Sequence, residues 1–362
     1  MRKRLTPEVF SIPVEQITSG FYSDKYFSRT SEILLADGNR NRVLMQVFTR
    51  KDGVLCGIDE AVAVLRTCSF DPEKLRIVAL YEGDSMVKNE TVMTIEGEYS
   101  SFAHLETVYL GVLARGSSVA TLVREAVTAA GGRMVLFFSS RFDHYLVQSR
   151  DGYAAMVGGT RLVSTDANGL FFGTEGVGTI PHSLIAAYEG DTLKACEAFK
   201  RHMPSGVNLI ALVDFENDCV KTSLEAARRF GAELWGVRLD TAKELRDRSV
   251  KGRGPDTVGD GSLGEDSLGE DSLGVCPELV WNVRKALDRE GFTHVKIVVS
   301  GGFDTKRIQK YVELGVPFDA VGVGSSFYKK KIDFTADIVM VNGTPCAKVG
   351  REYHPNPRLE EA

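Results

Sequence analysis

The chain has 362 residues, of which 43% are hydrophobic and 26% charged, and its formal net charge is −5. This length favours two domains, and the lack of a broad basic field argues against nucleic acid as a partner. No apolar run is long enough to cross a membrane, and residues 1–16 lack the apolar stretch of a signal peptide. The six cysteines are scattered without a CxxC pair, which predicts reduced thiols in the cytoplasm.

The first 115 residues mix short strands with helices. Residues 82–106 predict a strand, a turn, a second strand and then a helix that opens near Ser101. Asp84 and Asn89 occupy positions where turns are expected. From Thr107 onward, long helices alternate with short apolar strands.

The second part of the chain predicts a parallel sheet covered by helices on its outer face. Amphipathic helices are expected at 219–231 and 305–315. The spacing of the strands favours barrel-like closure, with an open doubly wound sheet as the alternative. Most strands end in polar residues, at the edge where α/β folds place their chemistry. The expected strands are 133–141, 169–179, 207–214, 232–240, 294–302 and 318–326.

An acidic, glycine-rich repeat of Ser-Leu-Gly-Glu-Asp occupies residues 259–275, within a loop expected at 252–276. Loops tolerate insertions well, so we favour a dispensable insertion over a lid. The repeat follows a predicted strand end, which places it near the mouth of the predicted site.

Two glycine-rich turns follow the last two predicted strands. Glycine allows a phosphate to approach backbone N–H groups, and a helix start adds a favourable dipole. Adjacent turns of this kind resemble the phosphate site that many barrels build from their last two loops. The turns contain Ser300, Gly301 and Gly302 in one case and Gly322, Gly324 and Ser325 in the other.

Charged residues end two neighbouring strands. Arg238 and Asp240 are two residues apart on a strand and therefore share a face, and Asp214 ends the preceding strand. The two aspartates could hold a pair of ribose hydroxyls or a Mg²⁺ ion. The alternative is a structural ion pair between Arg238 and Asp240.

An aromatic and an arginine follow the strand at 133–141. Phe138 and Arg141 suit a flat anionic ring, which would be held by stacking and by charge. The alternative is a core phenylalanine beside an exposed arginine.

His182 stands within the glycine-rich run "GTEGVGTIPHSLIAAY". It is expected at a helix start, which disfavours the imidazolium and leaves a nitrogen lone pair free. Such a neutral imidazole could attack phosphorus. A structural histidine is the alternative.

Taken together, these segments resemble the nicotinate phosphoribosyltransferases of the type II phosphoribosyltransferase family, which also includes nicotinamide and quinolinate enzymes. The resemblance spans nearly the whole chain through "SDKYFSRT" (23–30), residues 82–115, "SSRFDH", "GTIPHSLI", "ALVD", "GVRLD", "SGGFD" and "GVGSSF". It implies an N-terminal α/β sandwich (1–115) joined by the C-terminal tail (331–362), and an irregular, incomplete α/β barrel (116–330). It also implies a homodimer or higher homo-oligomer with the active site at the interface.

The resemblance implies transfer of phosphoribosyl from phosphoribosyl pyrophosphate (PRPP) to the pyridine nitrogen of nicotinate. Tyr26 of the neighbouring subunit and Phe138 would stack on the two faces of the ring, and Arg238 would meet its substituent. Arg141 and the two glycine-rich turns would hold PRPP, with Mg²⁺ arriving on PRPP, and Asp240 would contact the ribose. His182 matches a histidine that ATP phosphorylates in some members, so ATP is an expected co-substrate.

Nicotinamide, quinolinate and a non-catalytic PRPP-binding role are the alternatives. Nicotinamide enzymes tend to place an aspartate opposite the amide, where this chain has Thr165, which can donate to a carboxylate; Asp166 is adjacent. Quinolinate would need a denser basic cluster. Phe142, Asp143 and His144 replace the basic residue and proline that follow the arginine in several relatives. Cys346 stands alone where shorter relatives carry a zinc site, so no zinc is expected.

Overall fold

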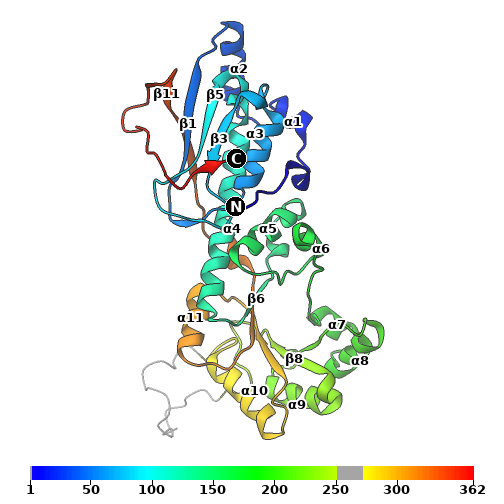
Figure 1. Ribbon diagram of the computed structural model, residues 1–362. Helices are drawn as coiled ribbons and strands as arrows, with labels where there is room; N and C mark the ends of the chain where they lie inside the picture. The colour runs from blue at the N-terminus through cyan, green and yellow to red at the C-terminus, as the bar shows by residue number, and fades with distance from the viewer. Residues whose placement is uncertain (1, 251–271) are drawn as a thin grey trace.

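The computed structural model describes residues 2–250 and 272–362. Most of the acidic repeat at 259–275 lies outside these residues. In the described part of the chain, no helix combines the length and the apolar character needed to cross a membrane. Figure 1 shows two units, one above the other, linked by the long helix α4 (Glu106–Ala129).

The upper unit is an antiparallel sheet with helices packed on one face. The strand order is β12-β11-β1-β5-β3-β13, so the C-terminal strands lie in the same sheet as the N-terminal ones. The strands are β1 (Arg42–Thr49), β3 (Arg76–Ala79), β5 (Thr91–Glu98), β11 (Phe334–Val341), β12 (Thr344–Pro345) and β13 (Glu360–Glu361), and the helices are α1 (Val14–Thr18), α2 (Lys25–Ala36) and α3 (Ile58–Cys68). The last residues of the chain therefore complete the N-terminal unit, as Figure 1 shows.

The predicted strand–turn–strand over 82–106 is present as the short strand β4 (Ser85–Met86) and β5. β4 pairs with β2 (Gly53–Val54) in a separate two-stranded sheet. The helix begins later than expected, at Glu106, because 3-10 turns occupy 99–101 and 103–105. Asn89 has a φ of 67°, as a turn position allows.

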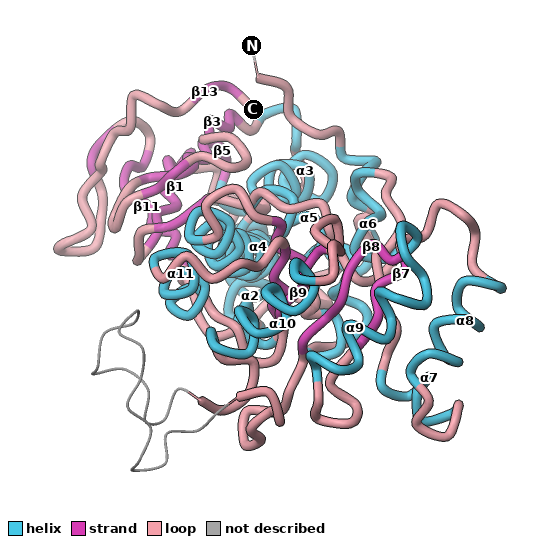
Figure 2. Tube along the Cα trace, turned by 90° about the horizontal axis from the view of Figure 1, so that it is seen from below, coloured by secondary structure: helices cyan, strands magenta, loops and turns pink. Residues whose placement is uncertain are grey.

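The lower unit is built on a parallel sheet of order β6-β10-β9-β8-β7. Its strands are β6 (Met134–Phe137), β7 (Leu209–Leu212), β8 (Leu234–Leu239), β9 (Lys296–Val299) and β10 (Ala320–Val323). Every residue of β7 and β10 is buried, as expected for strands covered on both faces. The view from below in Figure 2 shows α9 (Cys219–Phe230), α10 (Pro277–Arg289) and α11 (Thr305–Glu313) around these strands.

The strand expected at 169–179 does not form. Residues 166–172 make two short helical turns, α6 (Asp166–Gly169) and a 3-10 turn (Leu170–Phe172), and an irregular segment follows. This segment nevertheless closes much of the gap between the edge strands β6 and β7. Val163 pairs with Phe137, Val177 N–H donates to the Val163 carbonyl, and Ile180 N–H donates to the Ile210 carbonyl. The barrel is thus incomplete, and its closure is irregular.

Helix α4 contributes to both hydrophobic cores. Tyr109 and Leu113 pack with the N-terminal sheet, whereas Val119 and Val123 pack with the parallel sheet. Burial of an apolar stripe on each half stabilises a helix of 24 residues that has no side-chain cap. The boundary expected at residue 115 falls inside this helix, between the two sets of core residues.

Candidate active site

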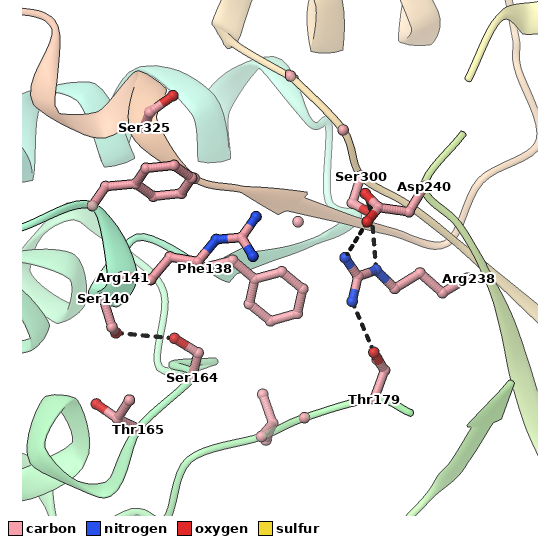
Figure 3. A pocket seen from close by; sticks show the side chains of 17 residues that line it. Phe138, Ser140, Arg141, Ser164, Thr165, Thr179, Arg238, Asp240, Ser300 and Ser325 are labelled. Carbon is pink, nitrogen blue, oxygen red and sulfur yellow. Dashed lines mark hydrogen bonds and ion pairs between the residues drawn. The ribbon is translucent and has the colours of Figure 1, made fainter. Parts of the chain in front are cut away.

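The carboxyl ends of β6, β8, β9 and β10 surround a cavity of about 370 Å³. Figure 3 shows Arg141 and Arg238 extending into it from opposite sides, with Phe138 near both. The lining includes eleven of the predicted site residues: Phe138, Arg141, Thr165, Arg238, Asp240, Ser300, Gly301, Gly302, Gly322, Gly324 and Ser325. Tyr26, His182 and Asp214 are not among the lining residues.

Three partners fix the Arg238 guanidinium. Its Nε donates to Ser300 Oγ, its Nη1 to Thr179 Oγ1 and its Nη2 to Asp240 Oδ2, each at 2.9 Å. The structural ion pair considered as the alternative is therefore present, with side chains only 17% and 19% exposed. A guanidinium has five N–H donors, so two remain after these three bonds. Arg238 is thus both anchored and able to bind an anion in the cavity.

Phe138 lies against Arg238, with the guanidinium carbon 5.4 Å from the ring centroid. The ring fits because residue 322 is glycine: a Cβ there would lie 2.6 Å from Cδ2 of Phe138. Gly324 relates to Phe142 in the same way, again at 2.6 Å. These two glycines make room for aromatic rings, in addition to the phosphate-binding role predicted from the sequence.

The turn after β9 needs glycine for its backbone conformation. Gly301 and Gly302 have φ values of 86° and 74°, which side chains disfavour. The preceding Ser300 is buried and donates to Asp240 Oδ1 at 2.7 Å. The turn therefore presents backbone to the cavity while Ser300 holds Asp240.

Arg141 is exposed, and its guanidinium carbon lies 5.2 Å from the Phe142 ring centroid. Within the described residues it has no hydrogen bond or ion pair, whereas Arg238 has three partners. The two cations of the cavity thus differ: Arg238 is held rigidly, and Arg141 is a free charge at the rim.

Thr165 was predicted to donate a hydrogen bond to the carboxylate of the substrate, but in the structure its hydroxyl has acceptors within the protein. Its hydroxyl lies 3.1 Å from Gln148 Oε1 and 2.9 Å from Asn168 Oδ1, and it caps α6 by accepting from Asn168 N–H. Because both acceptors compete for the one hydroxyl proton, donation to a substrate is disfavoured. The adjacent Asp166 accepts from Gly176 N–H and does not line the cavity.

His182 begins a helix, α7 (His182–Ala187), as predicted, but the helix has only six residues. Its Nε2 lies 3.1 and 3.0 Å from the two carboxylate oxygens of Asp214. This carboxylate, rather than the helix dipole, is the dominant neighbour, and it favours a proton on Nε2. Burial raises the pKa of Asp214 above its usual range, although His182 partly opposes the shift. Nδ1 is then the nitrogen with a lone pair.

Tyr26 lies on α2 in the N-terminal unit, away from the cavity of its own chain, and is 61% exposed. Phe21, Tyr22, Ile33 and Leu35 nearby are also exposed apolar side chains. This set lies on α2 and on the turn that precedes it.

The prediction overlooked several lining residues, namely Ser140, Phe142, Ser164, Val177, Gly178 and Thr179. Thr179 was recognisable in principle, because it precedes His182 in the same glycine-rich run. Ser140 and Ser164 lie 3.0 Å apart across two loops, a contact that only the tertiary structure reveals.

The described residues contain no group of three or more His, Cys, Asp or Glu side chains placed to share a metal ion. The two candidate carboxylates for Mg²⁺ each have a protein partner: Asp214 contacts His182, and Asp240 contacts Arg238 and Ser300. Oxygen ligands suit Mg²⁺, and both carboxylates follow neighbouring strands, β7 and β8.

Comparisons of the sequence and of the structure with known proteins find phosphoribosyltransferases and a nicotinate-nucleotide pyrophosphorylase. The model of the quinolinate phosphoribosyl transferase N-terminal domain matches residues 24–117. Nicotinate phosphoribosyltransferase pncB1 of Mycobacterium tuberculosis is 26% identical over 93% of this chain and 76% of its own length. Nicotinate-nucleotide pyrophosphorylase from Pyrococcus furiosus is 32% identical, with a TM-score of 0.79 over 97% of this chain and 82% of that one. Human nicotinic acid phosphoribosyltransferase shares the fold, with a TM-score of 0.65 at 15% identity over 91% and 77% of the two chains.

Proposed function

The chain belongs to the type II phosphoribosyltransferase family, and on that premise we propose that it converts nicotinate and PRPP to nicotinate mononucleotide and pyrophosphate. The observation that carries the proposal is the anchored Arg238 guanidinium beside the Phe138 ring. A planar cationic fork next to an aromatic face suits an aromatic carboxylate, which can stack and form a charge-assisted pair.

In the proposed reaction, the pyridine nitrogen forms a bond to C1 of the ribose as the bond from C1 to pyrophosphate breaks. Positive charge develops at the ribose and negative charge on the leaving pyrophosphate. The Asp240 carboxylate is suited to the ribose, and Arg141 with the Gly301–Gly302 backbone is suited to the phosphates. Mg²⁺, when bound to pyrophosphate, would neutralise part of its charge, and Asp214 and Asp240 are the carboxylates best suited to hold it.

Nicotinate fits the cavity better than the two related pyridines do. Quinolinate carries a second carboxylate, but among the described residues the lining contains only two cationic side chains, Arg141 and Arg238. If Arg141 binds phosphate, a single cation is left for the pyridine. Nicotinamide is neutral and would gain no charge-assisted bond from Arg238.

Pyrophosphate release from PRPP with nicotinate, nicotinamide and quinolinate, measured side by side, tests this assignment. We expect kcat/KM to be highest for nicotinate. Equal turnover of nicotinate and nicotinamide, or a preference for quinolinate, would contradict the choice of substrate.

We further propose that ATP phosphorylates His182 and that ATP hydrolysis is thereby coupled to turnover. Asp214 contacts Nε2, so Nδ1 would attack the γ-phosphorus and ADP would leave. A phosphate on His182 would add negative charge at the mouth of the barrel and could shift the affinity for PRPP, which is a coupling of binding free energies.

Incubation with γ-labelled ATP tests this coupling. Wild type should take up an acid-labile, base-stable label, His182→Ala should take up none, and Asp214→Asn should take up less. The exposed His202, on the separate helix α8 (Thr192–His202), offers a matched control, and His202→Ala should label normally. ATP should also lower the apparent KM for PRPP in the wild type. If wild type takes up no label and ATP does not change its kinetics, the proposed phosphorylation is wrong and His182 has a structural role.

The proposed assembly is a homodimer or larger homo-oligomer in which Tyr26 completes the neighbouring site. The support is its exposure among other apolar side chains on α2 and the turn that precedes it. We place the enzyme in the cytoplasm, since the five buried free cysteines suit a reducing compartment.

A further inference from the structure

Arg115 lies on α4, outside the lining of the cavity, but it contacts elements that form one side of the rim. Its guanidinium binds the buried carboxylate of Asp151 through two bonds, Nε to Oδ1 at 2.9 Å and Nη2 to Oδ2 at 2.7 Å. The Asp151 side chain is only 1% exposed. Because an unpaired buried carboxylate is costly, this pair fixes the orientation of the guanidinium.

The same guanidinium holds the loop that carries Arg141. Its Nη2 lies 2.7 Å from Asp143 Oδ2, two residues beyond Arg141. Asp143 also accepts the backbone N–H of His144 at 2.7 Å, and these contacts lower the pKa of its carboxyl. The carboxylate is therefore ionised near neutral pH and available to pair with Arg115.

Arg115 also supports the turn that carries Ser325. Its guanidinium carbon lies 4.7 Å from the ring centroid of Tyr328, at the end of the 3-10 turn Ser325–Tyr328. The Tyr328 hydroxyl donates to Asp151 Oδ2 at 2.9 Å. One arginine thus contacts, directly or through Asp151, both the Arg141 loop and the Ser325 turn.

The two elements meet at the cavity, where the Phe142 ring packs against Gly324. Arg141 itself has no bond that would fix its position among the described residues. The distance between its charge and the Gly324–Ser325 backbone therefore depends on how the loop is held from behind.

We propose that Arg115 is a positioning residue for PRPP, which holds the Arg141 loop and the Ser325 turn together so that both can engage the same pyrophosphate group. This inference rests on the proposed function for its substrate, and it assigns the network of Arg115, Asp143, Asp151 and Tyr328 to that substrate rather than to the pyridine. Among the residues that the structure describes, the side chains of Arg238 and Phe138, on which the pyridine depends, have no hydrogen bond, ion pair or ring contact with this network.

Asp143→Asn is the sharpest test, because it removes the ionic contact to the loop and leaves the buried pair of Arg115 and Asp151 intact. We expect KM for PRPP to rise about three- to tenfold, with KM for nicotinate and the melting temperature nearly unchanged. Arg115→Lys should give a larger rise, since an ammonium lacks the fork that reaches both carboxylates. Adding Asp143→Asn to Arg115→Lys should raise KM for PRPP little further, because both act through one contact.

Arg124→Lys is the matched control on the same helix. Arg124 donates to the carbonyls of Val157 and Gly158, away from the cavity, so its loss should alter stability alone. An unchanged KM for PRPP in Asp143→Asn would overturn the proposal. So would a parallel change in both KM values and the melting temperature, which would show a structural role only.

Hydrogen exchange separates this inference from the proposed function. The amides of residues 139–146 should exchange faster in Asp143→Asn than in wild type or Arg124→Lys, whatever the enzyme turns over. If wild type releases no pyrophosphate from PRPP, the proposed function is wrong. Equal exchange in the three proteins would show that the contact between Arg115 and Asp143 does not hold the Arg141 loop, and would overturn this inference. Faster exchange together with the selective rise in KM for PRPP supports both.

Discussion

Arg238 is the side chain on which the choice of substrate depends most directly. Its replacement by alanine should lower kcat/KM for nicotinate by a factor that corresponds to about 2–4 kcal/mol, the usual effect of removing one partner of a buried charged contact. Arg238→Lys should recover only part of this loss, because lysine lacks the fork that Ser300, Thr179 and Asp240 hold.

Steady-state kinetics with two pyridines checks the Arg238 prediction. Nicotinamide has no carboxylate, so its weaker turnover should fall less than that of nicotinate in Arg238→Ala. A similar loss for both pyridines would mean that Arg238 supports the fold of the site rather than the recognition of the carboxylate.

Glu106, at the start of α4, should make stability depend on pH. Burial raises the pKa of its carboxyl to about 8, with Asp337 and Asp24 adding to the shift and the Tyr99 hydroxyl opposing it. Because the folded pKa is above the unfolded value, the unfolded state binds fewer protons between about pH 4.5 and 8. Stability should therefore fall as pH rises through this range.

Glu106→Gln should remove much of that dependence, since glutamine stays neutral. The melting temperature of the variant relative to wild type should increase from pH 5 to pH 8, by an amount that corresponds to about 1–3 kcal/mol. Thermal unfolding of both proteins at pH 5, 6.5 and 8 measures this difference. Parallel curves would show that Glu106 ionises normally in the folded protein.

At the level of single residues, the sequence was most informative where spacing along one strand fixes a shared face. Arg238 lies on β8 and Asp240 directly follows the strand, two residues later, and their contact follows from that spacing. Thr165 shows the limit: its acceptors Gln148 and Asn168 come from α5 (Gln148–Gly158) and α6, and packing of those helices decides where its hydroxyl points.

Among the elements, β10 contributes to the site because Gly322 has no side chain. A methyl group at position 322 would meet the Phe138 ring, so Gly322→Ala should displace the ring from its place beside Arg238. We expect KM for nicotinate to rise about tenfold, in line with the energy of an aromatic contact, while KM for PRPP changes less.

Gly111→Ala is the control for the Gly322 prediction. A Cβ at position 111, on α4, would have no heavy atom within 4 Å outside the adjacent residues and the backbone of its own helix, so this substitution should leave the kinetics unchanged and stabilise the helix slightly. Unaltered KM for nicotinate in Gly322→Ala would mean that Phe138 does not contact the pyridine.

Five of the six expected strands of the lower unit are present, and the failure of the sixth has a physical reason. The five are short apolar runs that become buried on both faces, the pattern typical of parallel strands. Residues 169–179 contain four glycines, and Gly169 and Gly176 lie against backbone from Thr174 and Thr165. Glycine weakens a strand and permits such close contacts, so this segment folds onto itself and closes the barrel irregularly.

At the scale of the molecule, the chain order alone does not reveal that the two ends share one sheet. β11 pairs with β1 across nearly 300 residues of sequence, and β13 pairs with β3. The return of the tail was expected only through the resemblance to a family, because no local pattern specifies a partner that far away. The same holds for Tyr26, whose position on α2 in the upper unit gives it no contact with the cavity of its own chain.

The last prediction concerns Tyr26 and the proposed dimer. Tyr26→Ala and Arg238→Ala should each be nearly inactive alone. If Tyr26 completes the neighbouring site, a heterodimer of the two variants contains one site with both residues intact and one with neither. After random exchange of subunits in an equal mixture, half of the dimers are mixed, so about a quarter of the sites should be active. If Tyr26 served its own chain, every site in the mixture would lack one residue, and no activity would return. Kinetics of the mixture after mild dissociation and reassociation, with each variant treated alone as the control, distinguishes the two arrangements.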